Sequence, residues 1–599
     1  MPNQIKFKQG FTLVEVLVGI AVFLLIATAS YQAYISLFTL INLNQYKITA
    51  LNLVNEQFEI IRNLPYADVG VQGSIPKGKI PHTQTLTRSG VTFVVTATIR
   101  NVDLPFDGTI GGSPNDLSPS DNKIVEIQVD CASCKSFTPL SLTTTVAPKN
   151  LETASTNGAL FIRVFDANGI AIPDASVHIV NNKVSPAITI DDVTDVNGML
   201  QIVDVPPGTN AYEITVSKNG YSSDRTYTPG TLENPDPTQP HANVLIQQVT
   251  QISFVIDRLS TLSFSSVTPT CQAVPNIDFN LTGAKTIGTN IPKYSQNLIT
   301  NSSGVYSNSA IEWDTYQVLV NDADYNIIGL NPLNPILLNP NSSQNVRLIL
   351  QPKDPNTLLV TIKDSATNLP LTDAMIKVTG PASFNETKIS GRGFINQTNW
   401  SGGPNQTLYT DLIKYFFDDG STEIASPTGE IKLKNVFGAY NPSAVLESST
   451  IDTGSVSNFY NLTWGPVDQP VLAGPESVKF QFASNDSDPA TTTWEYVGPD
   501  GATTTYYTSS NTSLSSIHNG DRYARYKVFL KTDSTTVTPN ISDVAFTVTS
   551  SCTPPGQVVF SGLPLGTYHV EVGKSGYATS TLDVDLNVPW KEQEMILNQ

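Results

Sequence analysis

Residues 11–64 show an uninterrupted helical pattern. Residues 11–29 are apolar apart from two threonines and one charged side chain, Glu15. No proline occurs between Phe11 and Leu64, so one long helix is expected over residues 11–64. Its second half repeats apolar side chains at helical spacing, namely Leu51, Val54, Phe58 and Ile61. This stripe predicts a helix with one face packed on a globular domain.

After Pro65 the pattern changes to the alternation typical of β-strands. Between residues 91 and 146 three such segments, VTFVVTATIR, KIVEIQVD and LSLTTTVAP, are separated by clusters of Gly, Pro, Asn and Asp. They predict a small antiparallel sheet that packs against the helix. Residues 65–150 are therefore expected to form an α+β head.

Beyond residue 155 the chain repeats itself with a period of about 90 residues. The segment FSGLPLGTY at 560–568 echoes IVDVPPGT at 202–209, and a weaker copy lies between Leu262 and Leu350. We therefore predict tandem β-sandwiches. Their expected bounds are 155–250, 251–352, and 356–440 joined to 555–599, with an inserted aromatic-rich sandwich at 441–551. The predicted fold is mainly β, with one long N-terminal α-helix.

Charge and composition exclude some functions. The chain has 34 basic and 52 acidic side chains and a net charge of −18, so no nucleic-acid partner is expected. The five histidines show no metal-binding spacing, and no nucleophile motif is found. No enzyme activity, catalytic residue, cofactor or metal is therefore predicted. An envelope-anchored enzyme remains the alternative from another class.

The N-terminus has three interpretations. Lys6 and Lys8 precede an apolar stretch long enough to approach the span of a bilayer core. Ala27-Thr28-Ala29 would permit signal-peptide cleavage before Ser30, and an uncleaved anchor is a further alternative. Glu15 argues against both, because a carboxylate inside a membrane helix costs roughly 2.5 to 3.5 kcal/mol and an anchor has no use for it.

The stretch Gly10-Phe11-Thr12-Leu13, followed by Glu15 and an apolar helix, resembles the type IV prepilins and pseudopilins. The resemblance implies that residues 1–10 are a leader, that a prepilin peptidase cuts after Gly10, and that the new amine of Phe11 is methylated. It also implies that Glu15 pairs with the Phe11 amine of a neighbouring pilin subunit. The precursor would then be a single-pass protein of the bacterial inner membrane, with the bulk of the chain outside the cytoplasm.

The repeats resemble the carboxypeptidase regulatory-like, transthyretin-related sandwich. In that family the module is an accessory without catalytic residues, so the resemblance implies a structural or displayed role for the repeats.

The chain contains four cysteines. Cys131 and Cys134 form a CxxC in a strand connection without further metal ligands, so we predict a local disulfide, with free thiols as the alternative. Cys271 and Cys552 each precede a strand, and sequence alone does not establish whether they pair.

Candidate ligand contacts are confined to the insertion. Its aromatic side chains have polar neighbours and the composition of a sugar-stacking surface: Trp494, Tyr496, Tyr506 and Tyr507. The alternative is that they are core residues. Asp195 with Gly198, and Asp486 with Asp488, are weak calcium candidates, because turns use the same residues more often.

We therefore predict a large minor type IV pilin or pseudopilin. It would assemble through its N-terminal helix and display β-sandwiches on the pilus or cell surface for adhesion to a glycan or protein. A non-adhesive stalk and a secretion-system pseudopilin share the same N-terminus and remain alternatives.

Overall fold

A computed structural model describes residues 12–149, 154–354, 356–487 and 493–599. The predicted leader, with Gly10, and the predicted methylation site Phe11 lie outside the described residues, and so does Asp488. The chain divides into two compact units, Met1–Arg258 with Ile287–Ile291, and Leu259–Thr286 with Pro292–Gln599. The expected fold class is confirmed: one long helix precedes a large β-sandwich region.

The helix α1 (Leu13–Arg62) has 50 residues. Its C-terminal cap is Asn63, two residues before Pro65. Its last turns bury one face on the head: Ala50, Leu53, Val54, Gln57, Phe58 and Ile61. Leu51, expected in this stripe, is 41% exposed, and Leu53 takes its place at 1% exposure. The contact face therefore lies slightly around the helix from the predicted one.

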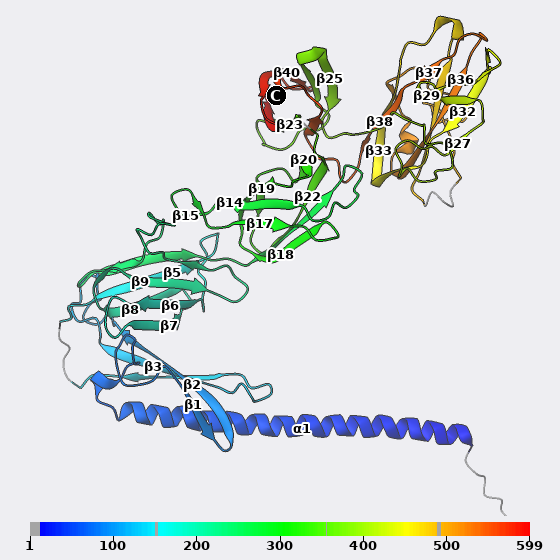
Figure 1. Ribbon diagram of the computed structural model, residues 1–599. Helices are drawn as coiled ribbons and strands as arrows, with labels where there is room; N and C mark the ends of the chain where they lie inside the picture. The colour runs from blue at the N-terminus through cyan, green and yellow to red at the C-terminus, as the bar shows by residue number, and fades with distance from the viewer. Residues whose placement is uncertain (1–11, 150–153, 355, 488–492) are drawn as a thin grey trace, which may run out of the picture. The chain divides into compact units, whose positions relative to one another are not determined.

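The head is a four-stranded antiparallel sheet in the order β1-β2-β3-β4 (Figure 1). Its strands are β1 (Thr83–Arg88), β2 (Val91–Val102), β3 (Asn122–Asp130) and β4 (Leu140–Val146). A short 3-10 helix, η1 (Tyr66–Asp68), follows α1. Strict alternation in β2 and β3 buries Phe93, Val95, Val125 and Ile127, which pack with the buried face of α1 into one core.

The first sandwich has two sheets in the orders β12-β5-β8 and β10-β9-β6-β7, with β11 paired to β9. Its strands are β5 (Gly158–Phe165), β6 (Ser176–Asn181), β7 (Ile188–Val193), β8 (Met199–Val205), β9 (Gly208–Ser217), β10 (Asp224–Arg225), β11 (Ala242–Val244) and β12 (Val249–Val255). Its first and last strands, β5 and β12, pair in parallel.

The second sandwich has sheets in the orders β18-β13-β22-β20 and β17-β14-β19-β21. Its strands are β13 (Ser260–Val267), β14 (Asp278–Gly283), β17 (Ser295–Ile299), β18 (Val305–Ile311), β19 (Asp314–Val320), β20 (Tyr325–Asn331), β21 (Ile336–Leu338) and β22 (Ser343–Pro352), with the hairpin β15 (Thr286–Gly288) and β16 (Ile291–Pro292). Here too the first and last strands, β13 and β22, pair in parallel.

The third sandwich has sheets in the orders β39-β23-β42 and β25-β24-β40-β41. Its strands are β23 (Thr357–Asp364), β24 (Met375–Gly380), β25 (Phe384–Ile389), β39 (Gln557–Phe560), β40 (Gly566–Gly573), β41 (Ser580–Leu586) and β42 (Trp590–Leu597), with the 3-10 helix η2 (Pro381–Ser383). The parallel pair of first and last strands recurs as β23 with β42. All three sandwiches thus share a strand pairing as well as a sequence echo.

The insertion between β25 and β39 is larger than predicted. β26 pairs with β38, and β29 pairs with β37, so residues 393–440 belong to the insertion and not to the third sandwich. The expected boundary at 440 is therefore wrong. Trp400 and Tyr415 lie in the same core as Phe480, and this burial explains why the chain from residue 393 onward folds with the later strands.

The insertion has an eight-stranded sheet ordered β26-β38-β33-β36-β32-β27, with β34 on β36 and β35 on β33, and a smaller sheet β28-β29-β37. Its elements are β26 (Gly393–Gln397), β27 (Phe417–Asp418), β28 (Thr422–Ala425), β29 (Thr428–Leu433), β30 (Asn435–Val436), β31 (Ala439–Tyr440), β32 (Ser443–Glu447), β33 (Ile451–Gly465), η3 (Val471–Ala473), β34 (Val478–Asn485), β35 (Thr512–Ser513), η4 (Ser516–His518), β36 (Asp521–Lys531), β37 (Asn540–Ile541) and β38 (Asp543–Thr549).

Candidate assembly site and displayed surface

The N-terminus of α1 is closed by a reciprocal cap between Thr12 and Glu15. The Glu15 backbone N–H donates to Thr12 Oγ1 at 3.3 Å, while Glu15 Oε2 accepts from the Thr12 backbone N–H at 2.9 Å and from Thr12 Oγ1 at 3.0 Å. Such a capping box satisfies donors that a helix start leaves open. The same threonine and glutamate that match the prepilin pattern therefore also begin the helix.

Only one oxygen of Glu15 is used in this cap. Within the described part of the chain, Glu15 Oε1 has no hydrogen-bond partner, and the side chain is exposed. A carboxylate can accept several hydrogen bonds, so the second oxygen remains available to a cation without loss of the cap.

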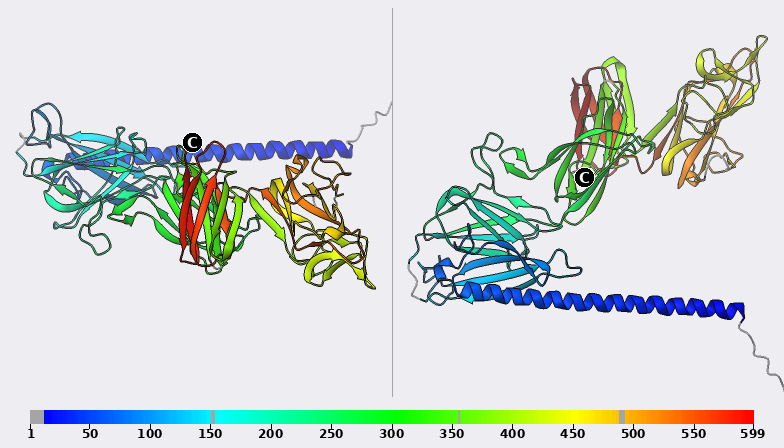
Figure 2. Two further views of the ribbon diagram at one scale, coloured as in Figure 1. Left: turned by 90° about the horizontal axis from the view of Figure 1, so that it is seen from above. Right: turned by 60° about the horizontal axis from the view of Figure 1, so that its bottom comes forward.

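The first half of α1 is apolar and does not touch the head. Figures 1 and 2 show it extending past the sheet that covers the last turns of the helix. No part of the most apolar 18-residue window of α1 is buried inside the protein, and α1 is long and apolar enough to cross a membrane. Single members are strongly exposed, for example Leu13 at 78% and Leu25 at 70%. A helix that is hydrophobic on all sides requires a bilayer or neighbouring helices around it.

The cysteines are paired. Cys131 and Cys134 form a disulfide in the β3–β4 connection, as the sequence suggested, with Cα atoms 5.4 Å apart. Cys271 and Cys552 form a second disulfide within the second unit, a pairing that the sequence had left open. Together with Val267, Ile328 and Ile349 they form a small buried cluster.

One of the four predicted aromatic ligand contacts of the insertion, Tyr507, is not at the surface. Tyr507 is 0% exposed and lies in the core, where its hydroxyl accepts a hydrogen bond from the Ser515 backbone N–H at 3.1 Å. Its side chain therefore has no surface to offer a ligand, which corrects the expectation for this residue. Trp494, Tyr496 and Tyr506 are half-buried.

These three half-buried rings are each covered by a cation. The Arg525 guanidinium lies 4.8 Å from the centre of the Trp494 ring, and Lys527 Nζ lies 4.1 Å from that of Tyr496. Lys479 Nζ lies 4.5 Å from the centre of the Tyr506 ring. Such contacts hold the rings in place.

The hydroxyl of Tyr496 has an electrostatic environment of its own. It donates to Glu447 Oε2 at 3.3 Å. Burial, reinforced by the charge of Glu447, raises the pKa of this phenol. Tyr496 therefore stays neutral and donates a hydrogen bond at any physiological pH.

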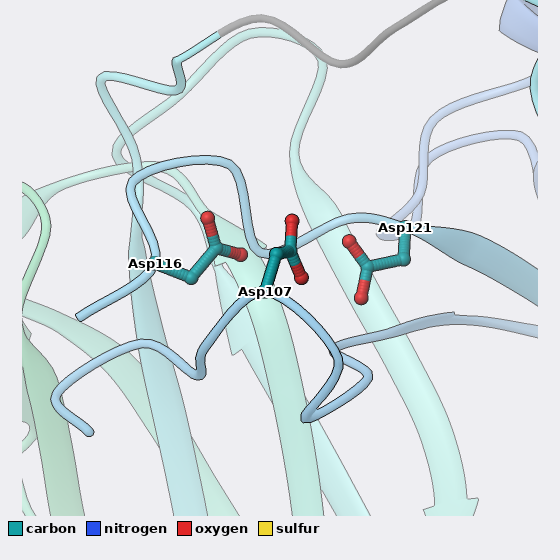
Figure 3. A group of neighbouring side chains, drawn as sticks. All are labelled: Asp107, Asp116 and Asp121. Atoms are coloured by element: carbon teal, nitrogen blue, oxygen red, sulfur yellow. The ribbon is translucent and has the colours of Figure 1, made fainter. Parts of the chain in front are cut away.

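Three aspartates that the sequence did not single out converge in the head. Asp107, Asp116 and Asp121, from the β2–β3 connection of the head, turn their carboxylates toward one another (Figure 3). Their ligand atoms all lie within 4.8 Å of one another. The signal available in the sequence was the density of aspartates in a long loop rich in glycine and proline. The weak calcium candidate Asp195 instead closes a β-turn, because its Oδ1 accepts from the backbone N–H groups of Asn197 and Met199.

Comparison with known proteins identifies one family feature. Residues 5–31 match the prokaryotic N-terminal methylation motif. This motif implies processing by a prepilin peptidase and assembly with other pilins, and together with α1 it supports a pilin or pseudopilin with a membrane-anchored precursor. No curated protein sequence matches the chain.

Solved structures with some similarity to this chain include the Bacillus anthracis TIE protein and two streptococcal pilins. The Bacillus anthracis TIE protein is 10% identical, with 86% of this chain and 74% of that chain covered, at a TM-score of 0.15. A Streptococcal ancillary pilin is 11% identical over 73% and 98% (TM-score 0.14), and GBS52, the minor pilin of Streptococcus agalactiae, is 11% identical over 33% and 96% (TM-score 0.17). TM-scores in this range do not establish a common fold.

Proposed function

We propose that this chain is a large minor type IV pilin or pseudopilin that assembles through α1 and carries its β-sandwiches outside the cell. The observation that supports the proposal most directly is a helix whose apolar first half is exposed and which begins, inside a methylation motif, with the capped carboxylate of Glu15. The chain is also proposed to lack catalytic activity.

The assembly step follows from the charge on Glu15. Cleavage after Gly10 would create an ammonium group on Phe11, and opposite charges in a poorly hydrated helix bundle attract more strongly than in water. Glu15 Oε1, which the cap does not use, is the atom that would accept from the Phe11 amine of a neighbouring subunit. Because an unpaired charge in such a bundle is costly, the pair would select one register between stacked helices.

The size of the chain supports a sparse or terminal position for this subunit in the filament. The chain from residue 155 to 599 forms three sandwiches and an insertion, whereas the head has only four strands. Repeated on every subunit of a closely packed helical filament, modules of this bulk would collide. The three sandwiches are proposed to be carboxypeptidase regulatory-like spacers, and their shared parallel pairing of first and last strands supports a common origin.

Incorporation into filaments tests the assembly proposal. Glutamine at position 15 keeps a capping box but removes the charge, so Glu15→Gln should reduce incorporation at least tenfold. Thr12→Val removes the hydroxyl of the cap and keeps the charge, and it should assemble nearly normally. Glu56→Gln, an exposed position on the same helix, is the matched control. Normal assembly of Glu15→Gln with failure of Thr12→Val would contradict the proposal.

Adhesion is proposed for the insertion, on the half-buried rings of Trp494, Tyr496 and Tyr506. Rings held rigidly by cations are preorganised for stacking on a sugar, so little side-chain freedom is lost on binding. A glycan and host-protein array probed with the full chain tests this role. Trp494→Ala and Tyr506→Ala should reduce binding, whereas Phe437→Ala, an exposed aromatic on another hairpin, should not. Absence of any binding would favour the non-adhesive stalk.

A further inference from the structure

The β2–β3 connection of the head, residues 103–121, holds a cluster of four aspartates. Asp103 directly follows β2, Asp121 directly precedes β3, and Asp107 and Asp116 lie between them. Figure 3 shows Asp107, Asp116 and Asp121 with their carboxylates facing a common point. Because the two ends of the connection meet there, the cluster closes the whole loop.

The loop is shaped by backbone contacts that place these side chains. Asp103 Oδ2 accepts from the Ile110 N–H at 2.8 Å, and Asp116 Oδ1 accepts from the Ser118 N–H at 2.8 Å. Asp121 Oδ2 accepts from the Leu104 N–H. Each of these three carboxylates therefore uses one oxygen to accept a backbone hydrogen bond that shapes the loop.

The remaining oxygens of the same carboxylates are buried and unsatisfied. Asp103 Oδ1, Asp116 Oδ2 and Asp121 Oδ1 have no hydrogen-bond partner among the described residues. Asp116 and Asp121 are each only 8% exposed. Buried carboxylate oxygens without a partner are rare in native proteins, because each costs its full desolvation free energy.

The charges in the cluster also lack a cation from the protein. Within the part of the chain that the structure describes, no Lys, Arg or His forms an ion pair with any of the four aspartates. Burial raises the pKa of Asp103, and the neighbouring Asp116, Asp121 and Asp107 carboxylates raise it further. The cluster thus concentrates negative charge that no cation among the described residues neutralises.

We propose that Asp107, Asp116 and Asp121, assisted by Asp103, form a calcium-binding site in the head. Oxygens that share one calcium ion at 2.3–2.6 Å lie at most about 5 Å apart, which agrees with the 4.8 Å limit within which these ligand atoms lie. One divalent cation held by Asp107, Asp116 and Asp121 would satisfy the orphaned oxygens of Asp116 and Asp121, and its charge would offset most of the repulsion that these carboxylates exert on Asp103.

The donor set selects calcium over other metals. All the side-chain ligands are carboxylate oxygens, which disfavours zinc, copper and nickel. Magnesium demands a near-ideal octahedron and keeps several waters, whereas calcium accepts three or more carboxylates in an irregular, flexible loop. The site lies in the part of the chain proposed to face the outside of the cell, where calcium is typically millimolar and modules bind it at about 0.1–1 mM.

The ion would stabilise the contact between the head and the first sandwich, which lie in the same unit. Leu117 O, beside Asp116, accepts from the Ser155 N–H at 2.9 Å. Ile110 of the same loop is buried with Ala159 and Val203 of the first sandwich. A loop closed by calcium would hold both contacts in place, and a loop whose carboxylates repel one another would loosen them.

Equilibrium dialysis of the purified full chain in detergent against radioactive calcium tests the site. We expect one ion per chain, and at least a tenfold loss of affinity in Asp116→Asn and in Asp121→Asn. Asp195→Asn, which removes the same charge from a β-turn of the first sandwich, is the matched control and should bind as the wild type does. No bound calcium, or equal binding by all variants, would overturn the proposal, and displacement of calcium by an equal concentration of magnesium would contradict the choice of ion.

A second measurement separates metal binding from a structural role of Asp116. With calcium present, Asp116→Asn should melt at a lower temperature than the wild type. In a calcium chelator the order should reverse or vanish, because the substitution relieves repulsion among the remaining carboxylates. Equal destabilisation with and without calcium would mean that Asp116 only shapes the loop, and the proposal would fall.

Discussion

Arg100 of β2 in the head makes a bidentate ion pair with Asp192 of β7 in the first sandwich. The Arg100 Nε donates to Asp192 Oδ2 at 2.5 Å and a terminal guanidinium nitrogen donates to Asp192 Oδ1. The Asp192 side chain is only 3% exposed, and its hydrogen bonds with Arg100 raise the pKa of the guanidinium. The contact between these two domains is thus made specific by one ion pair, in which the carboxylate is buried and the guanidinium is partly exposed.

Loss of Arg100 should therefore weaken this joint. Arg100→Met would leave the Asp192 carboxylate buried without a cation, which costs about 3 kcal/mol in the stability of β7 against local opening. Hydrogen exchange of the β7 peptides measures it. The double variant Arg100→Met with Asp192→Leu should recover most of the loss, because a buried pair replaced by apolar groups is often neutral. Equal destabilisation by the single and double variants would show that the pair does not couple the domains.

The buried face of α1 predicts a strong contrast between two leucines. Leu53 is 1% exposed in the core of the head, so Leu53→Ala should cost about 2–5 kcal/mol in the free energy of unfolding. Leu51 is 41% exposed, and Leu51→Ala should cost less than about 1 kcal/mol. Thermal unfolding of the head monitors both variants. Similar losses from the two would place the contact face elsewhere on the helix.

The disulfide between Cys271 and Cys552 should hold the second sandwich to the base of the insertion. The two cysteines are 281 residues apart in sequence, so the bond closes a long loop. Replacing both by serine should destabilise the second unit by about 2–4 kcal/mol and speed proteolysis near residue 552. Serine replacement of Cys131 and Cys134, which closes only a local loop, is the control. Unchanged proteolysis after loss of the long-range bond would contradict this role.

The burial of His518 predicts that the insertion loses stability in acid. His518 is 2% exposed, and its Nδ1 lies 2.8 Å from Ser484 Oγ. That hydroxyl already donates to Asp521 Oδ2 at 2.6 Å, so Nδ1–H must be the donor to Ser484. Nε2 therefore carries the lone pair and has no partner among the described residues. Burial lowers the pKa of His518 to about 4.

The stability of the insertion should therefore fall as the pH drops below about 6.5, the pKa of an unfolded histidine. Between pH 6.5 and about 4, His518 is protonated in the unfolded chain but neutral in the folded chain. Each decrease of one pH unit in this range therefore shifts the equilibrium further toward the unfolded chain. Below the folded pKa the effect levels off, and above pH 6.5 it is absent. His518→Gln should remove this slope, as measured by hydrogen exchange of β34 and β36 peptides. An unchanged slope in the variant would assign the acid sensitivity to other groups.

Local patterns predicted the elements of this fold well because they depend on near neighbours. The absence of proline up to Leu64 predicted α1, and alternation predicted β2 and β3. The phase of the buried helix face was missed because Gln57, a polar residue, is buried. It accepts a hydrogen bond from Gln84 Nε2 at 2.7 Å, a contact that only the folded sheet provides.

Long-range pairings were not predictable in the same way. The true start of the insertion depends on β26 pairing with β38, about 150 residues later, and its short strands carry little periodicity. The burial of Tyr507 and the convergence of Asp107 with Asp121 likewise depend on loops that the sequence does not place. The residues proposed for assembly could be named from the sequence because their pattern is local, from Gly10 to Glu15.

The mature N-terminus tests the central claim most directly. Mass spectrometry of the chain isolated from its native envelope or filaments identifies the first residue and its modification. If the chain is processed as a prepilin, it begins at Phe11 and carries a methyl group on the new amine. A chain that begins at Ser30 would contradict the claim because it lacks Glu15, and a chain that begins at Met1 would contradict it because its ammonium lies ten residues before Phe11.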